Sequence, residues 1–282
     1  MLCNLNEVLL DAQKGKYAVG LFNSVTLEMT EAIFRAAEKL NSPVIMGTAE
    51  ILLPAASLES VADMIINRAK RSKIPVVLHY DHGLTFEKCM EALKLGYTSV
   101  MYDCSTESYD ENVSRVREMV KIAHAMNVTV EGELGHVGDN DGAGKLEKPS
   151  DYYTSVEMAE DFTHKTGIDA LAIAVGNAHG DYKFPPKLDF QRIRDIRDAA
   201  KIPLVLHGGS GLSDNDFKTA IDCGICKVNI FTDINKAQVF GMKQAINSGI
   251  VGAFDIVPYE IDAIQNVVEK YMRLFSSVNH VA

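Results

Sequence analysis

The sequence predicts a single (β/α)8 barrel, the α/β fold also called a TIM barrel. The chain has 282 residues, which is close to the usual length of this fold. Short β-branched runs alternate with longer amphipathic runs, and eight candidate strands occur in order. Most of these strands are apolar without alternation, as is typical of parallel strands buried on both faces. Eight βα units in one chain favour a closed barrel, with its active site at the carboxyl ends of the strands.

The elements follow one another in a regular order. Gly or Pro residues separate the helices from the next strand, for example at Gly96, Gly167 and Gly224. The strands are expected at 17–23, 43–48, 75–79, 99–103, 129–133, 170–175, 203–207 and 227–230. The clearest helices are expected at 29–40, 58–71, 86–95 and 109–126.

No linker or low-complexity tract divides the chain, so we expect one domain over residues 1–282. Residues 245–282 continue beyond the eighth unit as a C-terminal helical extension. The segment 138–148 is rich in Gly and Asp and lacks apolar periodicity. It follows the fifth strand, and we expect it to be a mobile loop over the active face.

Composition limits the partners and the location of the protein. A formal net charge of −10 argues against a nucleic-acid partner, which would require a basic face. No apolar run is long enough to span a bilayer, so no membrane contact is expected. The N-terminus lacks a secretory pattern, and the five scattered cysteines do not suggest a disulfide framework. These features favour a cytoplasmic protein.

Polar side chains gather where the predicted strands end. A buried strand has little reason to end in a carboxylate or an imidazole unless something binds there, and barrel closure would bring these ends into one funnel. The residues are Asn23, Asp81, His82, Asp103, Glu133, His179, His207 and Asn229.

Three of these residues are histidines: His82, His179 and His207. A single histidine would more often be structural, but three imidazoles at three strand ends indicate a catalytic zinc site. Asp103 and Glu133 add carboxylates to the same rim, with helix capping or salt bridging as the alternative interpretation.

Glycines beside two of these histidines point to a phosphate site. His179 is followed by Gly180, and His207 is followed by Gly208-Gly209-Ser210-Gly211. Glycine lets backbone amides approach an anion closely, and phosphate sites after the seventh and eighth strands recur in this fold.

Five segments carry a family resemblance. They are Leu78-His79-Tyr80-Asp81-His82-Gly83, Glu131-Gly132-Glu133-Leu134-Gly135, Gly176-Asn177-Ala178-His179-Gly180, Leu206-His207-Gly208-Gly209-Ser210-Gly211 and Lys227-Val228-Asn229-Ile230. With these segments in this order, the chain resembles the class II fructose-bisphosphate and tagatose-bisphosphate aldolases from about residue 4 to about residue 244. Such enzymes are lyases that act on sugar phosphates, and the resemblance implies a homodimer or homotetramer.

The resemblance also implies roles. His82, His179 and His207 match the ligands of one catalytic Zn2+. Asp103 and Glu133 match carboxylates of an alternative or second metal position, or of a monovalent cation site. Asp81 matches the acid–base residue that acts on the C4 hydroxyl. Asp141 matches the loop carboxylate that protonates C3, although the family commonly has Glu there and Asp139 is an alternative.

The pocket for dihydroxyacetone phosphate is implied in the same way. Gly180, Gly208, Ser210, Asn229 and Thr232 match this pocket, and Lys183 matches a phosphate-contacting lysine of some members. We assign Asn23 and Gly209 to the same substrate-binding set. His79 is expected either to point into the barrel or to support the metal ligands.

The distal half of the site departs from the family pattern. The segment 254–259 lacks the arginine that reaches the distal phosphate, and Gly47-Thr48-Ala49 lacks the serine that some members use. Phe231 replaces a smaller or acidic residue. We therefore expect a ketose 1-phosphate to be a better substrate than a 1,6-bisphosphate.

Three alternatives stay open at this point. One is another metal-dependent barrel enzyme, such as an epimerase. An aldolase with a Schiff-base lysine would need a lysine at the catalytic end of a strand, whereas Lys227 begins its predicted strand. The last alternative is a non-catalytic companion subunit of an aldolase, which the retention of Asp81 and all three histidines argues against.

Overall fold

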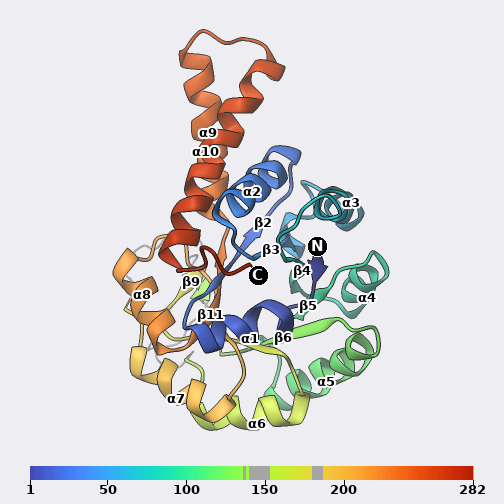
Figure 1. Ribbon diagram of the computed structural model, residues 1–282. Helices are drawn as coiled ribbons and strands as arrows, with labels where there is room; N and C mark the ends of the chain where they lie inside the picture. Colours follow the sequence, from blue (N-terminus) through green and yellow to red (C-terminus); the bar gives the residue numbers. More distant parts are fainter. Residues whose placement is uncertain (136–137, 140–152, 180–186, 282) are drawn as a thin grey trace.

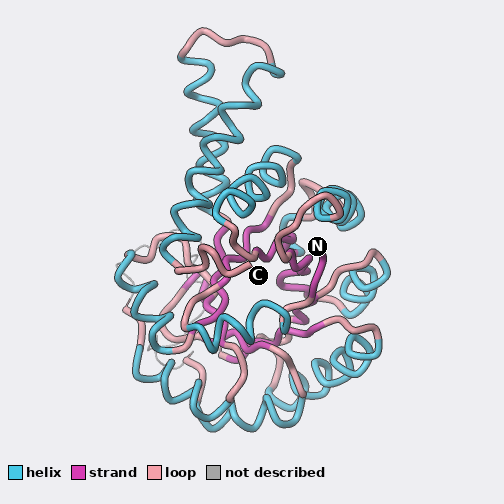
Figure 2. Tube along the Cα trace, viewed as in Figure 1, coloured by secondary structure: helices cyan, strands magenta, loops and turns pink. Residues whose placement is uncertain are grey.

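A computed structural model describes residues 1–135, 138–139, 153–179 and 187–281. Eight parallel strands form a closed ring, because the outermost strands β4 and β5 also pair with each other. Figure 2 shows this ring surrounded by helices. The barrel strands are β2 (Val19–Asn23), β3 (Val44–Ala49), β4 (Val76–Gly83), β5 (Ser99–Tyr102), β6 (Thr129–Leu134), β8 (Ala170–Ile173), β10 (Leu204–Leu206) and β11 (Ile225–Ile230). The predicted (β/α)8 barrel is confirmed.

A helix follows each barrel strand, and the helices after the first seven strands pack their apolar stripes on the outside of the ring. The capping signals act locally: Ser213 forms a capping box with Asp216, and Asp189 accepts a hydrogen bond from the amide of Arg192. The outer helices are α2 (Leu27–Leu40), α3 (Leu58–Ala69), α4 (Phe86–Lys94), α5 (Tyr109–Ala125), α6 (Val156–Thr166), α7 (Phe190–Ala200), α8 (Asp214–Cys223) and α9 (Thr232–Asn247), and a short 3-10 helix, η1 (Glu50–Leu52), follows β3.

The amino-terminal segment closes the end of the barrel at which the strands begin, opposite the predicted active face. Strand β1 (Leu2–Cys3) pairs in parallel with the start of β4, and helix α1 (Asn6–Gly15) crosses the end of the ring (Figure 1). Leu5 and Leu9 are fully buried and belong to an inner apolar cluster with Val19, Val77 and other barrel residues. This end of the barrel is therefore a packed core.

The C-terminal helix α10 (Ala253–Leu274) pairs with α9, and the two project from the barrel as a hairpin (Figure 1). Gln238 of α9 donates a hydrogen bond of 2.6 Å to Glu260 of α10. At the connection between the helices, Val251 and Phe254 are almost fully exposed. None of the helices in the described part of the chain is both long and apolar enough to cross a membrane.

Candidate metal centre and active site

An irregularity in β4 turns two consecutive side chains toward one cavity. Consecutive residues of a regular strand point to opposite faces. Here the pairing of β4 with β5 shifts register between Tyr80 and Gly83, and His82 adopts a left-handed backbone conformation with a φ of 46°. Asp81 and His82 therefore both line the cavity at the top of the barrel. A non-glycine residue in this conformation is strained, and such strain often occurs at functional sites.

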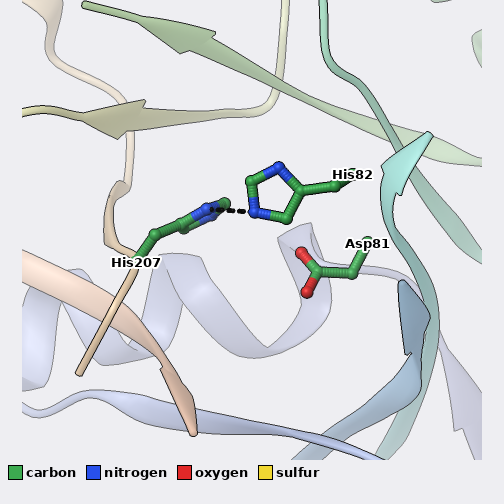
Figure 3. Close-up of side chains that lie close together, drawn as sticks. All are labelled: Asp81, His82 and His207. Carbon is green, nitrogen blue, oxygen red and sulfur yellow. Dashed lines mark hydrogen bonds between the residues drawn. The ribbon is translucent and has the colours of Figure 1, made fainter. Parts of the chain in front are cut away.

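His82 and His207 point toward each other at hydrogen-bonding distance, with His207 buried beneath the cavity (Figure 3). The Nε2 of His82 lies 2.8 Å from the Nδ1 of His207, and the two rings are nearly perpendicular, at 80°. The other nitrogen of each ring meets a carboxylate: His82 Nδ1 lies 2.7 Å from Asp103, and His207 Nε2 lies 2.8 Å from Glu131. Because an ionised carboxylate only accepts hydrogen bonds, both outer nitrogens are donors and the inner nitrogens turn toward each other.

This donor set fits a metal ion. Two inward lone pairs at 2.8 Å repel unless a proton lies between them or a metal ion binds to both. Burial alone would lower the pKa of His82, but the Asp81 charge and the hydrogen bond to Asp103 raise it to about 10, so the site favours positive charge. Among the described residues, two sets of ligand atoms are close enough to hold a metal, namely Asp81 with His82 and His207, and His82 with Asp103 and Glu133. An outer carboxylate on each imidazole is the usual support of a metal-binding histidine.

Asp81 is held by two asparagines from neighbouring strands. Asn23 donates to its Oδ2 at 2.8 Å, and Asn229 donates to its Oδ1 at 3.0 Å. Burial opposes its charge, but His82 and then Lys227 outweigh that effect and lower the pKa of Asp81 well below its usual range. Asp81 is therefore an ionised base, and the buried amide oxygens of both asparagines have no hydrogen-bond partner among the described residues.

The cavity above these residues has a volume of about 400 Å³ and two chemically different ends. One end is lined by Gly208, Gly209 and Ser210 after β10 and by Thr232 at the start of α9. The other end is lined by the aliphatic side chains of Ile51, Leu52 and Leu84 after β3 and β4, and Ser105 and Thr106 after β5 also line the cavity. Asp81 and His82 also line the cavity, and neither lysine nor arginine occurs among its described lining residues.

The structure gathers most of the residues that the sequence analysis selected. Around the cavity lie Asn23, Asp81, His82, Asp103, Glu133, Gly208, Gly209, Ser210, Asn229 and Thr232. His207 is fully buried beneath them, and its Nδ1 lies 3.5 Å from Glu133. The predicted position of His79 inside the barrel agrees with the structure, where it is fully buried with its Nδ1 2.8 Å from the Ser99 hydroxyl.

Other selected residues fall outside the described part of the chain. Gly180, Lys183 and Asp141 are among them. His179 belongs to β9 (Ala178–His179), whose backbone pairs in parallel with β7 (Gly138–Asp139), but the side chains of His179 and Asp139 are likewise outside the described part.

The prediction for Lys227 needs a correction. Strand β11 begins at Ile225, so Lys227 lies within the strand, and its fully buried Nζ pairs with Glu131 at 2.8 Å. A register shift in the pairing of β10 with β11, between Leu204 and Val205, changes which residues face the interior. The sequence analysis gave no role to Glu131, although it lies two residues before Glu133 and so points to the same face of β6.

Comparison with known proteins supplies the family. The model of class II fructose-bisphosphate aldolases matches residues 3–280. The fructose-bisphosphate aldolase of Geobacillus stearothermophilus is 38% identical over 293 residues, covering all of this chain and 99% of that protein. The fructose-bisphosphate aldolase of Helicobacter pylori is 37% identical over 310 residues and covers the whole of both chains. The crystal structure of the YdjI aldolase from Escherichia coli K12 superposes over the whole of both chains with a TM-score of 0.91 and 33% identity.

The chain belongs to the class II fructose-bisphosphate aldolase family. Members of this family are metal-dependent lyases.

Proposed function

We propose that the protein is a zinc-dependent aldolase that cleaves and forms the carbon–carbon bond next to dihydroxyacetone phosphate. The observation that carries this proposal is the pair of inward imidazole nitrogens of His82 and His207, 2.8 Å apart, beside the ionised carboxylate of Asp81. Two neutral nitrogen ligands suit zinc, and the adjacent base suits removal of a hydroxyl proton.

His82 and His207 would hold the zinc ion together with His179, whose side chain lies outside the described residues. When bound, the ion supplies Lewis-acid stabilisation of the negative charge that develops on the substrate oxygens. Glu133, with its Oε2 3.5 Å from His207 Nδ1, is suited to an alternative or second metal position. Asp103 supports His82 through the 2.7 Å hydrogen bond, which makes it more useful for orienting the imidazole than for binding the same ion directly.

Asp81 would take the proton from the C4 hydroxyl as the C3–C4 bond breaks. Its two oxygens are fixed by Asn23 and Asn229, so the carboxylate need not reorient during the step. The free amide oxygens of these asparagines are suited to accept hydrogen bonds from substrate hydroxyls. A second group must protonate C3 of the released fragment, and Asp141, or Asp139 as the alternative, is proposed for this role from the loop after β6.

The phosphate of dihydroxyacetone phosphate would bind at the glycine-rich end of the cavity. Gly208, Gly209 and Ser210 let backbone amides and one hydroxyl approach an anion. Thr232 begins α9, and the amino-terminal end of a helix favours negative charge. Gly180 and Lys183 are proposed to complete this site.

The far end of the cavity supports a substrate without a second phosphate. Ile51, Leu52 and Leu84 offer neither a charge nor a hydrogen-bond donor in their side chains, and Ala49 beside them carries no hydroxyl. A ketose 1-phosphate would therefore be handled better than a 1,6-bisphosphate. A homodimer or homotetramer and a cytoplasmic location complete the proposal, and the five free, buried cysteines suit a reducing compartment.

The decisive experiment measures release of dihydroxyacetone phosphate from a panel of ketose 1-phosphates. We expect a chelator to abolish the release and added zinc to restore it. Borohydride with substrate should not inactivate the enzyme, because the described residues around the cavity include no lysine that could form a Schiff base and Lys227 is paired beneath it. Activity that survives chelation would contradict the zinc mechanism, and zinc binding without any cleavage would favour a companion subunit.

A further inference from the structure

A buried ion pair lies directly beneath the proposed metal centre. Glu131 of β6 and Lys227 of β11 are both fully buried, and the Nζ of Lys227 lies 2.8 Å from one carboxylate oxygen of Glu131 and 3.1 Å from the other. The two residues come from strands that are not neighbours in the barrel, so their side chains meet across its interior. An ion pair at this depth is costly to desolvate and is weak evidence for stability alone.

Glu131 also holds His207. Its Oε1 lies 2.8 Å from the Nε2 of His207. Both of its carboxylate oxygens also contact the buried ammonium group of Lys227, at 2.8 and 3.1 Å. The carboxylate is therefore ionised and can only accept, so the proton of His207 lies on Nε2 and the Nδ1 lone pair faces His82.

The comparison with His82 explains why a lysine is needed. Asp103 supports His82 in the same manner, but the Asp103 side chain is 12% exposed and also accepts from the backbone amide of Ser105. Glu131 has no exposed surface, so its charge needs a counterion inside the barrel. Lys227 supplies that counterion without touching either imidazole ring by any described hydrogen bond.

We infer that Glu131 and Lys227 form a positioning pair that holds His207 in its Nε2-protonated tautomer, with Nδ1 directed at the metal. This inference rests on the proposed metal centre. The inference adds to that centre a role for two residues that do not line the substrate cavity. The competing interpretation is that the pair only fills the barrel interior, in which case neutral side chains of similar size would replace it without consequence for the metal.

Two double variants separate these interpretations. Glu131→Gln/Lys227→Met and Glu131→Leu/Lys227→Met both remove the two charges together, so neither leaves an unpaired buried charge. They differ in one respect: glutamine keeps an acceptor for His207 Nε2, and leucine does not. Ser99→Ala is a further control, because it removes a hydrogen bond to His79 in the same interior without touching His207.

Zinc affinity and the tautomer of His207 are the readouts. We expect the leucine variant to bind zinc 10- to 100-fold more weakly in chelator competition, the usual cost of losing such a support, and the glutamine variant and Ser99→Ala to stay within a few-fold of wild type. Equal zinc affinity in the two double variants would overturn the inference. Thermal unfolding of each variant separates these effects from a general loss of stability.

The tautomer of His207 can be measured in the wild-type protein. Histidine 15N NMR of the wild-type protein after chelation should find His207 protonated at Nε2, and protonation at Nδ1 would overturn the inference even if a double variant failed to fold. A protein that shows these differences in zinc affinity but cleaves no ketose 1-phosphate would contradict the proposed reaction and still support the positioning pair.

Discussion

The Nε2 of His82 lies 2.8 Å from the Nδ1 of His207, although the two residues are 125 positions apart in the chain. Strands β4 and β10 bring them together at the carboxyl end of the barrel. Each imidazole is backed by a carboxylate on its outer nitrogen, so the two inner nitrogens converge on one point. This relationship carries the proposed metal centre.

Removing either inner nitrogen should remove the metal. We expect His207→Ala to lose both bound zinc and aldol cleavage, because its Nδ1 is one of the converging donors. Metal analysis of the purified variant together with the release of dihydroxyacetone phosphate checks this. His124→Ala is a suitable control, since His124 is partly exposed and lies on α5, where it bonds Asp169. Full zinc content in His207→Ala would show that the ligand set is wrong.

The catalytic role of Asp81 should be testable without loss of the bound metal. Asp81→Asn keeps the shape of the side chain but removes the base, so zinc should stay bound while cleavage falls by about 10²- to 10⁴-fold, the usual contribution of a positioned acid–base group. Asn23→Ala, which removes only one of the two hydrogen bonds to this carboxylate, should cost less. Metal content and kcat are the measurements. Near-normal cleavage by Asp81→Asn would exclude the proposed role.

The fold was predictable because the barrel repeats one local pattern. All eight strands lie within two residues of their expected starts, and the helices that were expected at 29–40 and 58–71 begin at Leu27 and Leu58. The closing helix α1 was not predicted, since its short amphipathic run precedes the first βα unit and resembles any surface helix. Its role depends on contacts with strands far along the chain, which periodicity does not reveal.

The site was predictable as a set of residue types but not as a set of contacts. Strand β4 was expected to end at 79, yet it runs on to Gly83, and only the register shift explains why Asp81 and His82 both face the cavity. The interior position of Lys227 depends on the irregular pairing of β11 in the same way. Such irregularities arise from long-range strand pairing, so a local pattern does not predict them.

Gly47 lies on β3 where this strand packs closely against β4, and we expect no side chain to be tolerated there. A Cβ atom on Gly47 of β3 would lie 1.7 Å from the backbone oxygen of His79 on β4. We expect Gly47→Ala to destabilise the protein by about 1–3 kcal/mol, the range of overpacked interiors, and to weaken zinc binding because β4 carries His82. Chemical denaturation and chelator competition measure the two effects. An unchanged free energy of unfolding would contradict this close approach of the two strands.

An ion-pair network between α2 and α3 should make stability depend on pH. Arg68 forms paired hydrogen bonds to Glu38 at 2.9 and 2.8 Å, and chiefly for this reason the pKa of Glu38 is lowered. The stabilisation is therefore present above the pKa of Glu38 in the unfolded chain and is lost as the pH falls through its lower folded pKa.

Arg68→Met tests this dependence. Because the pair is partly exposed, we expect a loss of about 0.5–1 kcal/mol at pH 7, and the difference from wild type should shrink as Glu38 is protonated. Denaturation curves at several pH values provide the measurement. Arg35→Met is the matched control, since Arg35 is more exposed and contacts only Glu31 in the same network. A difference that is independent of pH would assign the effect to the packing of Arg68 over Phe34.

The far end of the cavity should set the preference for substrate charge. An arginine–phosphate contact is strong and directional, whereas the far end is lined by the aliphatic side chains of Ile51, Leu52 and Leu84. We expect kcat/KM for a ketose 1-phosphate to exceed that for the 1,6-bisphosphate of the same stereochemistry.

Leu84, whose side chain is largely exposed, offers a position for a gain of function. Leu84→Arg should raise kcat/KM for the bisphosphate. Leu84→Gln, which replaces leucine by an uncharged polar side chain of similar size, should not. A wild-type preference for the bisphosphate of 100-fold would correspond to about 2.7 kcal/mol of transition-state binding. It would mean that a distal phosphate site is formed by residues outside the described part of the chain or by a second subunit.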